Sequence, residues 1–86
     1  MKYTDSGKKI NAGDLVFVEN RARGLVICDY DDWVCVPGYE RWLTKAELVG
    51  GGTLSSGIMV ESKELGFIHY SQDDDDVVFI SSSSQL

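Results

Sequence analysis

The chain has 86 residues, which is enough for one small domain and too few for two separate hydrophobic cores. Hydrophobic residues make up 43% of the sequence, a proportion typical of globular proteins, so a disordered chain is excluded. Fourteen acidic against eight basic residues give a net charge of −6, which argues against a general nucleic-acid binder because phosphates require a cationic surface.

Residues 1–12 are polar and are expected to form a loose lead-in that ends at the turn signal Gly13-Asp14. Six runs follow that are rich in β-branched and aromatic residues and are separated by polar turns, which predicts five or six short strands. These runs cover residues 15–19, 25–30, 33–36, 57–62, 65–70 and 77–80. Residues 81–86 are serine-rich and are expected to be a polar tail.

Three local features carry more specific expectations. If Asp31-Asp32 is a two-residue turn, Cys28 faces Cys35 across the strand pair. The helical spacing of apolar residues in the middle of the chain predicts a short helix or 3₁₀ turn at about residues 44–48. Gly66 inside a strand pattern indicates a bulge or a close approach of two backbones.

Many short strands with almost no helix are typical of an all-β protein. We therefore expect a single domain of residues 1–86, in which residues 13–80 form a small SH3-like barrel or a strongly bent antiparallel sheet of about five or six strands with at most one short helix. Side chains alternate along a strand, so one residue of each adjacent apolar pair should point into the core. The core candidates are Val16 or Phe17, Val26 or Ile27, Val34, Ile58 or Val60, Phe67 or Ile68, and Val78 or Phe79.

Charge is distributed unevenly along the chain. Residues 1–45 contain seven acidic and seven basic residues, whereas residues 46–86 contain seven acidic residues and one basic residue, so the second half carries the whole charge of −6. Grouped like charges repel one another without helping the fold, so we expect the aspartate groups to meet a basic protein partner. The candidates are Asp29, Asp31, Asp32, Asp73, Asp74, Asp75 and Asp76. The alternative is that these aspartates are solvated loops with no role in binding.

Three aromatic residues close together in the sequence, Trp33, Tyr39 and Trp42, complete the predicted partner-binding surface. A small barrel has little room to bury all three rings, so one or two are expected at the surface. Tryptophan and tyrosine beside acidic groups are effective anchors in protein interfaces. The alternative is core packing, which we expect for at least one of the tryptophans.

An enzyme is not expected from this sequence. Cys28, Cys35 and His69 are its only cysteine and histidine residues, which is too few for a structural zinc site. No glycine-rich oxyanion loop lies beside either cysteine, and the aspartate runs lack the spacing of a calcium-binding EF-hand, so neither a metal nor another cofactor is expected. We interpret the cysteines as reduced thiols in packed strands and His69 as a structural residue.

The sequence has no targeting features. Its apolar runs are far shorter than the about 20 residues that span a bilayer, so no membrane segment is expected. Residues 1–9 lack the apolar region of a secretory signal peptide, which favours a cytoplasmic location.

Two parts of the sequence resemble known small domains. The run Gly13-Asp14-Leu15-Val16-Phe17-Val18, followed by Arg23-Gly24-Leu25-Val26-Ile27, resembles the opening of SH3-like barrels. The second half is similar to small acidic SH3-like bacterial immunity proteins of polymorphic toxin systems. The matching runs are Trp42-Leu43, Gly57-Ile58-Met59-Val60, Leu65-Gly66-Phe67-Ile68-His69-Tyr70 and Asp75-Asp76-Val77-Val78-Phe79-Ile80. Gly50-Gly51-Gly52 is an insertion relative to that pattern.

The resemblance implies a stoichiometric inhibitor that binds a cognate toxin in the producing cell and occludes its active site. Many toxins that act in the cytosol attack nucleic acids and present basic clefts, to which an acidic protein is complementary. The alternative function is a generic SH3-like adaptor module that binds a peptide or protein partner through its aromatic cluster. Neither pattern indicates an oligomeric state.

Overall fold

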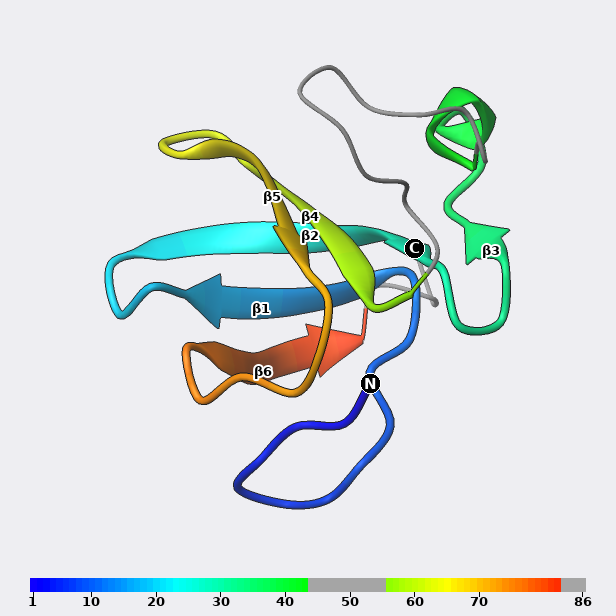
Figure 1. Cartoon of the computed structure of the whole chain (residues 1–86). Helices are drawn as coiled ribbons and strands as arrows, with labels where there is room; N and C mark the ends of the chain where they lie inside the picture. Colours follow the sequence, from blue (N-terminus) through cyan, green and yellow to red (C-terminus); the bar gives the residue numbers. More distant parts are fainter. Residues whose placement is uncertain (44–55, 83–86) are drawn as a thin grey trace.

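Six antiparallel strands form one sheet in the part of the chain that the computed structural model describes, residues 1–43 and 56–82 (Figure 1). The strands are β1 (Asp14–Val18), β2 (Ala22–Asp29), β3 (Val34–Cys35), β4 (Ile58–Ser62), β5 (Gly66–Tyr70) and β6 (Val77–Ser82), and the 3₁₀ helix η1 (Glu40–Trp42) follows β3. Neighbouring strands follow the order β5-β4-β2-β1-β6, and β3 pairs with β2 outside this path. The predicted all-β fold class is confirmed as a strongly bent antiparallel sheet.

Bulges and one glycine bend the sheet, so that the β4–β5 hairpin crosses the layer of β2, β1 and β6 (Figure 1). The β2–β4 ladder shifts register between Val26 and Cys28, and the β1–β6 ladder shifts after Leu15. Gly24 allows β2 and β4 to approach closely, because a Cβ atom there would lie 2.4 Å from Val60 Cγ1. Bulges increase the local twist, so the sheet folds over itself and encloses a core.

The β1–β2 connection is a tight turn that lies earlier in the chain than the sequence indicated. Glu19 and Asn20 have φ angles of 54° and 56°, and the Arg21 N–H donates to the Val18 carbonyl at 3.1 Å. Two successive residues with positive φ are the mark of a type I′ turn, whose twist matches that of the strands it joins. β2 therefore begins at Ala22, before the predicted run.

Two other turns differ in detail from the sequence expectations. The predicted register of Cys28 opposite Cys35 is confirmed, but the turn spans residues 30–33, with a φ of 57° at Trp33, and not two residues alone. Gly66 has a φ of 80° where the β4–β5 turn enters β5, in a ladder without a register shift and with open space around its Cβ position. Gly66 therefore serves the turn, and the expected bulge or close approach is wrong.

The main core lies inside the bent sheet and uses alternate residues of its strands. Its buried members are Tyr3, Ile10, Val16, Val18, Ala22, Val26, Ile58, Val60, Tyr70 and Val77. The predicted core residues on β5 and β6 contribute less buried apolar surface to this core, because Ile68 and Phe79 are only partly buried. The expectation for Val34 is wrong: this residue is 50% exposed because β3 is a two-residue strand beside the main path of the sheet.

A second buried cluster involves the strand β2 again. It contains Ile27, Cys28, Tyr30 and Met59, with Leu25, Cys35, Tyr39, Trp42 and Leu43 packed against it. The bulge in β2 lets Val26 enter the main core while Ile27 enters this second cluster, so both members of that predicted pair are buried. The segment that contains β3 and η1 covers the cluster.

The N-terminal hairpin, residues 1–12, belongs to the fold and is not the loose lead-in that its polarity suggested. Tyr3 and Ile10 are 1% and 0% exposed, and Lys2 and Lys9 form an antiparallel bridge. The Tyr3 hydroxyl donates to the buried Asp14 carboxylate at 2.8 Å. These two apolar residues are isolated in a polar segment and show no periodicity, so no local pattern indicates that they belong to the core.

Two expectations concern residues outside the described ranges, namely the short helix at 44–48 and the end of the predicted tail at 83–86. Ser81 and Ser82, the first residues of that tail, belong to β6. None of the helical structure in residues 1–43 and 56–82 is long and apolar enough to cross a membrane.

Candidate protein-binding surface

The first group of predicted binding residues lies in the β2–β3 turn and stabilises the fold. Asp29 is 3% exposed, and its Oδ1 accepts the N–H groups of Asp31 at 3.1 Å and of Asp32 at 3.4 Å. An aspartate that accepts N–H groups of the following residues stabilises a turn. The assumption that grouped aspartates contribute nothing to the fold is therefore wrong at Asp29.

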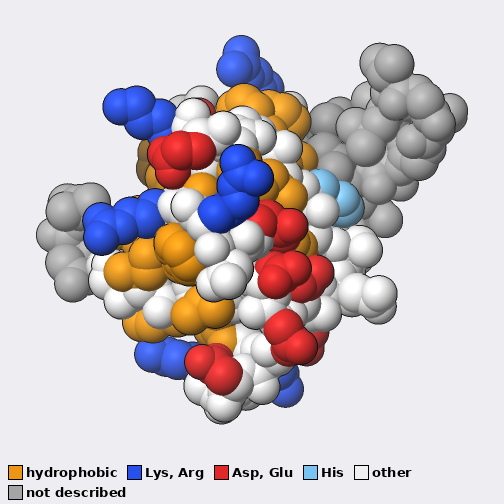
Figure 2. All heavy atoms as spheres, turned by 90° about the vertical axis from the view of Figure 1, so that its left-hand side faces the viewer, with side chains coloured by type: hydrophobic (Ala, Val, Ile, Leu, Met, Phe, Trp, Pro, Cys, Tyr) orange, Lys and Arg blue, Asp and Glu red, His pale blue; other side chains and the backbone are white. Residues whose placement is uncertain are grey.

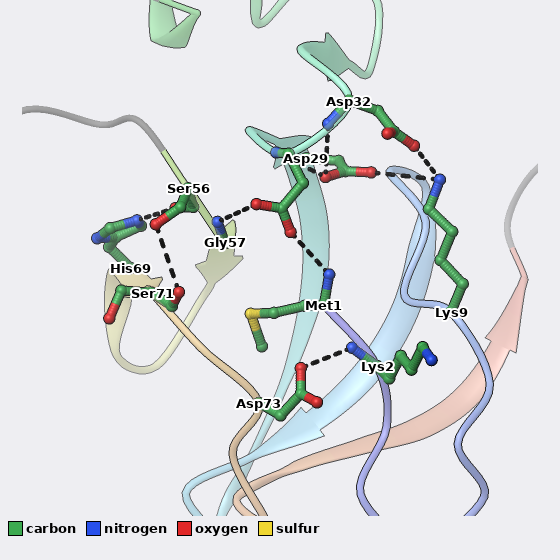
Figure 3. A network of polar contacts seen from close by, with 11 residues as sticks. Met1, Lys2, Lys9, Asp29, Asp32, Ser56, Gly57, His69, Ser71 and Asp73 are labelled. Carbon is green, nitrogen blue, oxygen red and sulfur yellow. Dashed lines mark hydrogen bonds and ion pairs between the residues drawn. The ribbon is translucent and has the colours of Figure 1, made fainter.

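The other two acids of this turn, Asp31 and Asp32, contact partners inside the molecule, and Figure 3 shows Asp32 beside Lys9. Asp31 accepts the Met1 amino group at 2.8 Å and the Gly57 N–H at 3.1 Å. These two hydrogen bonds hold the pKa of Asp31 below its usual value. The Asp32 carboxylate forms an ion pair with Lys9 Nζ. Both side chains are exposed, but their charges are partly compensated within the chain.

Asp73 opens the second group of predicted acids and also contacts the N-terminal hairpin (Figure 3). Its Oδ1 accepts the Lys2 N–H at 2.8 Å. Lys9, on the returning side of the same hairpin, has its Nζ 3.8 Å from Asp29 Oδ2. Acids from two segments that are far apart in the sequence thus hold one hairpin in place.

Asp74, Asp75 and Asp76 gather with Glu19, and these four residues are termed the acidic cluster. The Glu19 N–H donates to the Asp76 carbonyl at 3.0 Å, which joins the β1–β2 turn to the β5–β6 connection. The negative charge of Glu19 is the main cause of a raised pKa at Asp76, followed by desolvation and by Asp74 and Asp75. Among the described residues, no Lys or Arg side chain forms an ion pair with any of the four. Figure 2 shows the band of acidic side chains at this end of the molecule.

An open depression of about 460 Å³ adjoins the acidic cluster and is lined by Glu19, Arg21, Leu65 and Ile68. The buried Tyr70 donates its hydroxyl to Glu19 Oε2 at 2.6 Å, and burial together with this bond raises the pKa of Tyr70. A lysine or arginine side chain can lay its aliphatic stem on Leu65 and Ile68 while its charged end reaches Glu19. The depression thus offers apolar and acidic contacts, and its lining also includes the cationic side chain of Arg21.

Glu19 was not selected from the sequence, where it reads as the last residue of a strand. Its position depends on the type I′ turn, since the positive φ of Glu19 directs the chain toward the β5–β6 connection. Glutamate is uncommon at positive φ, and the neighbouring Asn20 was the one available signal of this turn.

The predicted aromatic anchors Trp33 and Tyr39 lie in different surroundings. Trp33 is 37% exposed in the β2–β3 turn, and its ring centroid is 6.0 Å from that of Tyr30. Tyr39 is half-buried, and its hydroxyl donates to Glu61 Oε1 at 2.6 Å. Both rings keep some surface open to solvent, as expected for anchors at an interface.

The third anchor, Trp42, stacks on Phe67, with ring centroids 4.6 Å apart and planes inclined by 35°. Trp42 packs against the second buried cluster, whereas 46% of Phe67 is exposed. Phe67 and Ile68 were expected to share a core position, and Ile68 is the residue that points inward. Tyr39, Trp42 and Phe67 are termed the aromatic face.

The predicted binding residues do not form one continuous surface. In Figure 1, β3 and η1 lie at the opposite end of the sheet from the β1–β2 turn and the β5–β6 connection. The acids of residues 29–32 lie with Trp33 at the first end, whereas Asp74, Asp75 and Asp76 lie at the second end with Glu19.

The cysteines and the histidine lie in settings that do not activate them. Burial raises the pKa of the Cys28 thiol to about 11, and desolvation together with the charge of Glu40 raises that of Cys35, so both thiols are protonated and weakly nucleophilic at neutral pH. Both cysteines are free. His69 Nε2 lies 2.8 Å from the Ser56 carbonyl oxygen. In the described ranges, no three His, Cys, Asp or Glu side chains gather in a way that could hold a metal ion.

No protein-family model, no curated protein and no solved structure matches this chain. What the protein does is therefore inferred from its residues and their geometry, since a fold alone does not determine function.

Proposed function

We propose that this chain is a protein-binding inhibitor, an immunity protein that neutralises a cognate bacterial toxin in the cytoplasm by occluding a basic surface of the toxin. The observation that carries the proposal is the acidic cluster, whose members have no ion-pair partner among the described residues. Carboxylates held together in this way repel one another, and the raised pKa of Asp76 has this cause. A cationic partner removes the repulsion and is attracted from a distance.

The depression beside Glu19 supports binding of a protein rather than of a free ion. Its apolar residues Leu65 and Ile68 offer contact to an aliphatic stem, and Glu19 offers a carboxylate to the charged end. Such a site favours lysine or arginine presented on a folded surface. The choice of a toxin as the partner rests on the resemblance of the second half of the sequence to immunity proteins.

The state of the thiols supports a role without catalysis. Both have raised pKa values, so neither provides the thiolate that a cysteine hydrolase requires. His69 faces a backbone carbonyl and the ring edge of Tyr30, with centroids 5.8 Å apart, and not a nucleophile. A stoichiometric inhibitor requires none of these chemical functions.

The test uses the toxin domain with which this chain is proposed to pair and measures association by stopped-flow fluorescence. The variant Asp75→Asn with Asp76→Asn removes two charges of the acidic cluster and leaves Asp74, whose Oδ1 accepts the Asp76 N–H at 2.8 Å. The matched control, Asp5→Asn with Glu64→Gln, removes two charges from exposed residues elsewhere.

We expect the cluster variant to associate about three- to tenfold more slowly at low salt, with a weaker dependence on salt than the wild type. The control variant should stay within about twofold, although its net charge is the same as that of the cluster variant. Equal association rates for both variants would show that the acidic cluster does not face the toxin. Failure of the wild type to protect cells that express the toxin would reject the immunity function itself.

A peptide-binding adaptor module is the second candidate, and the aromatic face favours it. Phe67 is stacked on Trp42 and leaves 46% of its surface exposed, which resembles the aromatic grooves that bind extended peptides. The replacement Phe67→Ala separates the two functions, with Val34→Ala as a control at another exposed apolar residue. Loss of binding in the Phe67 variant alone, with the acidic-cluster variant unaffected, would favour the adaptor.

A further inference from the structure

One outer face of the sheet is apolar and exposed. On β1 and β6, the residues that alternate with the buried core point to this side, and 36% of Leu15, 42% of Val78 and 42% of Ile80 are exposed. Phe17 is half-buried and lies directly opposite Val78 in the ladder. These four residues are termed the outer apolar face. Adjacent apolar side chains left open on a sheet mark an interaction surface.

Opposite charges flank the outer apolar face. On the β2 side, the exposed Arg23 lies directly opposite Phe17 in the β1–β2 ladder. On the β6 side, the exposed Asp75 and Asp76 immediately precede the first residue of β6. Arg23 thus gives the β2 margin a basic group, and Asp75 with Asp76 gives the β6 margin acidic groups at the end where β6 begins. Lys8, whose Nζ lies 4.8 Å from the ring centroid of Phe79, is a second cation on the β6 side.

We propose that a second copy of this chain covers the outer apolar face and forms a two-fold symmetric dimer. A two-fold axis that runs parallel to β1 in the plane of the interface exchanges the β2 margin with the β6 margin. Leu15 and Phe17, on the middle strand, then meet their own counterparts. Arg23 of each copy lies over the β6 margin of the other, close to Asp76. Each charge contact is made twice, as an interface between identical surfaces requires.

The two margins favour a second copy over other partners. A uniformly basic or uniformly acidic protein complements only one margin, whereas an identical surface turned about the axis complements both. The net charge of −6 on each chain opposes association, so we expect a dissociation constant of about 10–100 µM. The dimer forms without the toxin, so its test does not depend on the proposed function.

The first test is sedimentation velocity on the full chain from about 5 to 500 µM. Val78→Glu places a charge in the outer apolar face, and Val34→Glu is the matched control at an apolar residue that is 50% exposed on β3. We expect a wild-type dimer that Val78→Glu weakens at least tenfold and Val34→Glu changes by less than about twofold. Circular dichroism verifies that both variants are folded. A monomeric wild type at 500 µM overturns the proposal, as does equal weakening by both variants.

The second test reverses the charges of the two margins. Arg23→Asp and Asp76→Arg each place like charges together across the interface and should weaken the dimer about tenfold. The double variant restores opposite charges with the margins exchanged and should return to within about threefold of the wild type. A double variant that is weaker than either single variant overturns the proposed geometry.

Discussion

Replacing Asp29 by alanine should destabilise the fold, although Asp29 belongs to a group of acids that reads as a solvated loop. Its carboxylate is 3% exposed and accepts two backbone N–H groups. The 3.1 Å bond from Asp31 contributes about 1 kcal/mol and the longer bond from Asp32 about 0.5 kcal/mol. Lys9, at 3.8 Å with a half-exposed side chain, adds little. The expected loss in the free energy of unfolding is about 1.5–2 kcal/mol.

Urea unfolding followed by far-ultraviolet circular dichroism measures this loss, which corresponds to a fall in Tm of about 6–16 °C for a domain of this size. Asp29→Asn keeps an oxygen acceptor and should lose about half as much. The control is Asp75→Ala, an exposed aspartate whose side chain makes no hydrogen bond or ion pair with the described residues, and it should stay within about 0.5 kcal/mol. If Asp29→Ala is as stable as the wild type, or if Asp75→Ala loses as much free energy of unfolding, Asp29 does not stabilise the turn.

Three further predictions concern other parts of the molecule. Gly24→Ala should lower the free energy of unfolding by about 2 kcal/mol, because its Cβ would lie 2.4 Å from Val60 Cγ1. In a double-mutant cycle measured by urea unfolding, Gly24→Ala combined with Val60→Ala should lose less free energy than the sum of the two single changes. The pKa of Asp76 is raised in the folded state, so its stabilising contribution is present at low pH and is lost as pH rises. The urea midpoint of Asp76→Asn should equal that of the wild type near pH 3 and exceed it near pH 6.5. Equal midpoints at both pH values would contradict this prediction. In an Ellman assay at pH 7.5, Cys28 should react only after denaturation because its pKa is about 11 and its side chain is buried, while the partly exposed Cys35 reacts first; fast reaction of both thiols in the folded protein would count against this.

The strands were predictable because alternation of apolar and polar residues is a local property that a sheet with one buried face imposes. Exceptions occur where a turn or bulge decides the outcome. β2 starts early because the chain turns at Glu19-Asn20, and Ile27 is buried beside Val26 because a bulge sends the two side chains to different clusters. On β5, alternation held but did not decide which member of the pair points inward: Ile68 packs against the core and Phe67 is exposed.

The candidate site was less predictable, because identical residue types take different roles. Asp29 and Asp75 both belong to aspartate-rich segments, yet the first is a buried turn acceptor and the second is exposed. Only the pairing of distant segments separates them. The same holds for Glu19, which joins the acidic cluster through a contact between the β1–β2 turn and the β5–β6 connection.

The central position of β2 divides the molecule into regions that open at different free energies. β2 pairs with β1, β3 and β4, and its residues enter both buried clusters. The β2 amide hydrogens that bond to β1 and β4 should therefore exchange with solvent only when the whole domain unfolds. β3 is held by two residue pairs, Cys28 with Cys35 and Asp29 with Val34. The segment that carries Tyr39 and Trp42 can therefore open as a local unit while the bent sheet stays intact. A partner that binds the aromatic face would then slow exchange in this segment and leave the exchange of the β2 amides bonded to β1 and β4 unchanged.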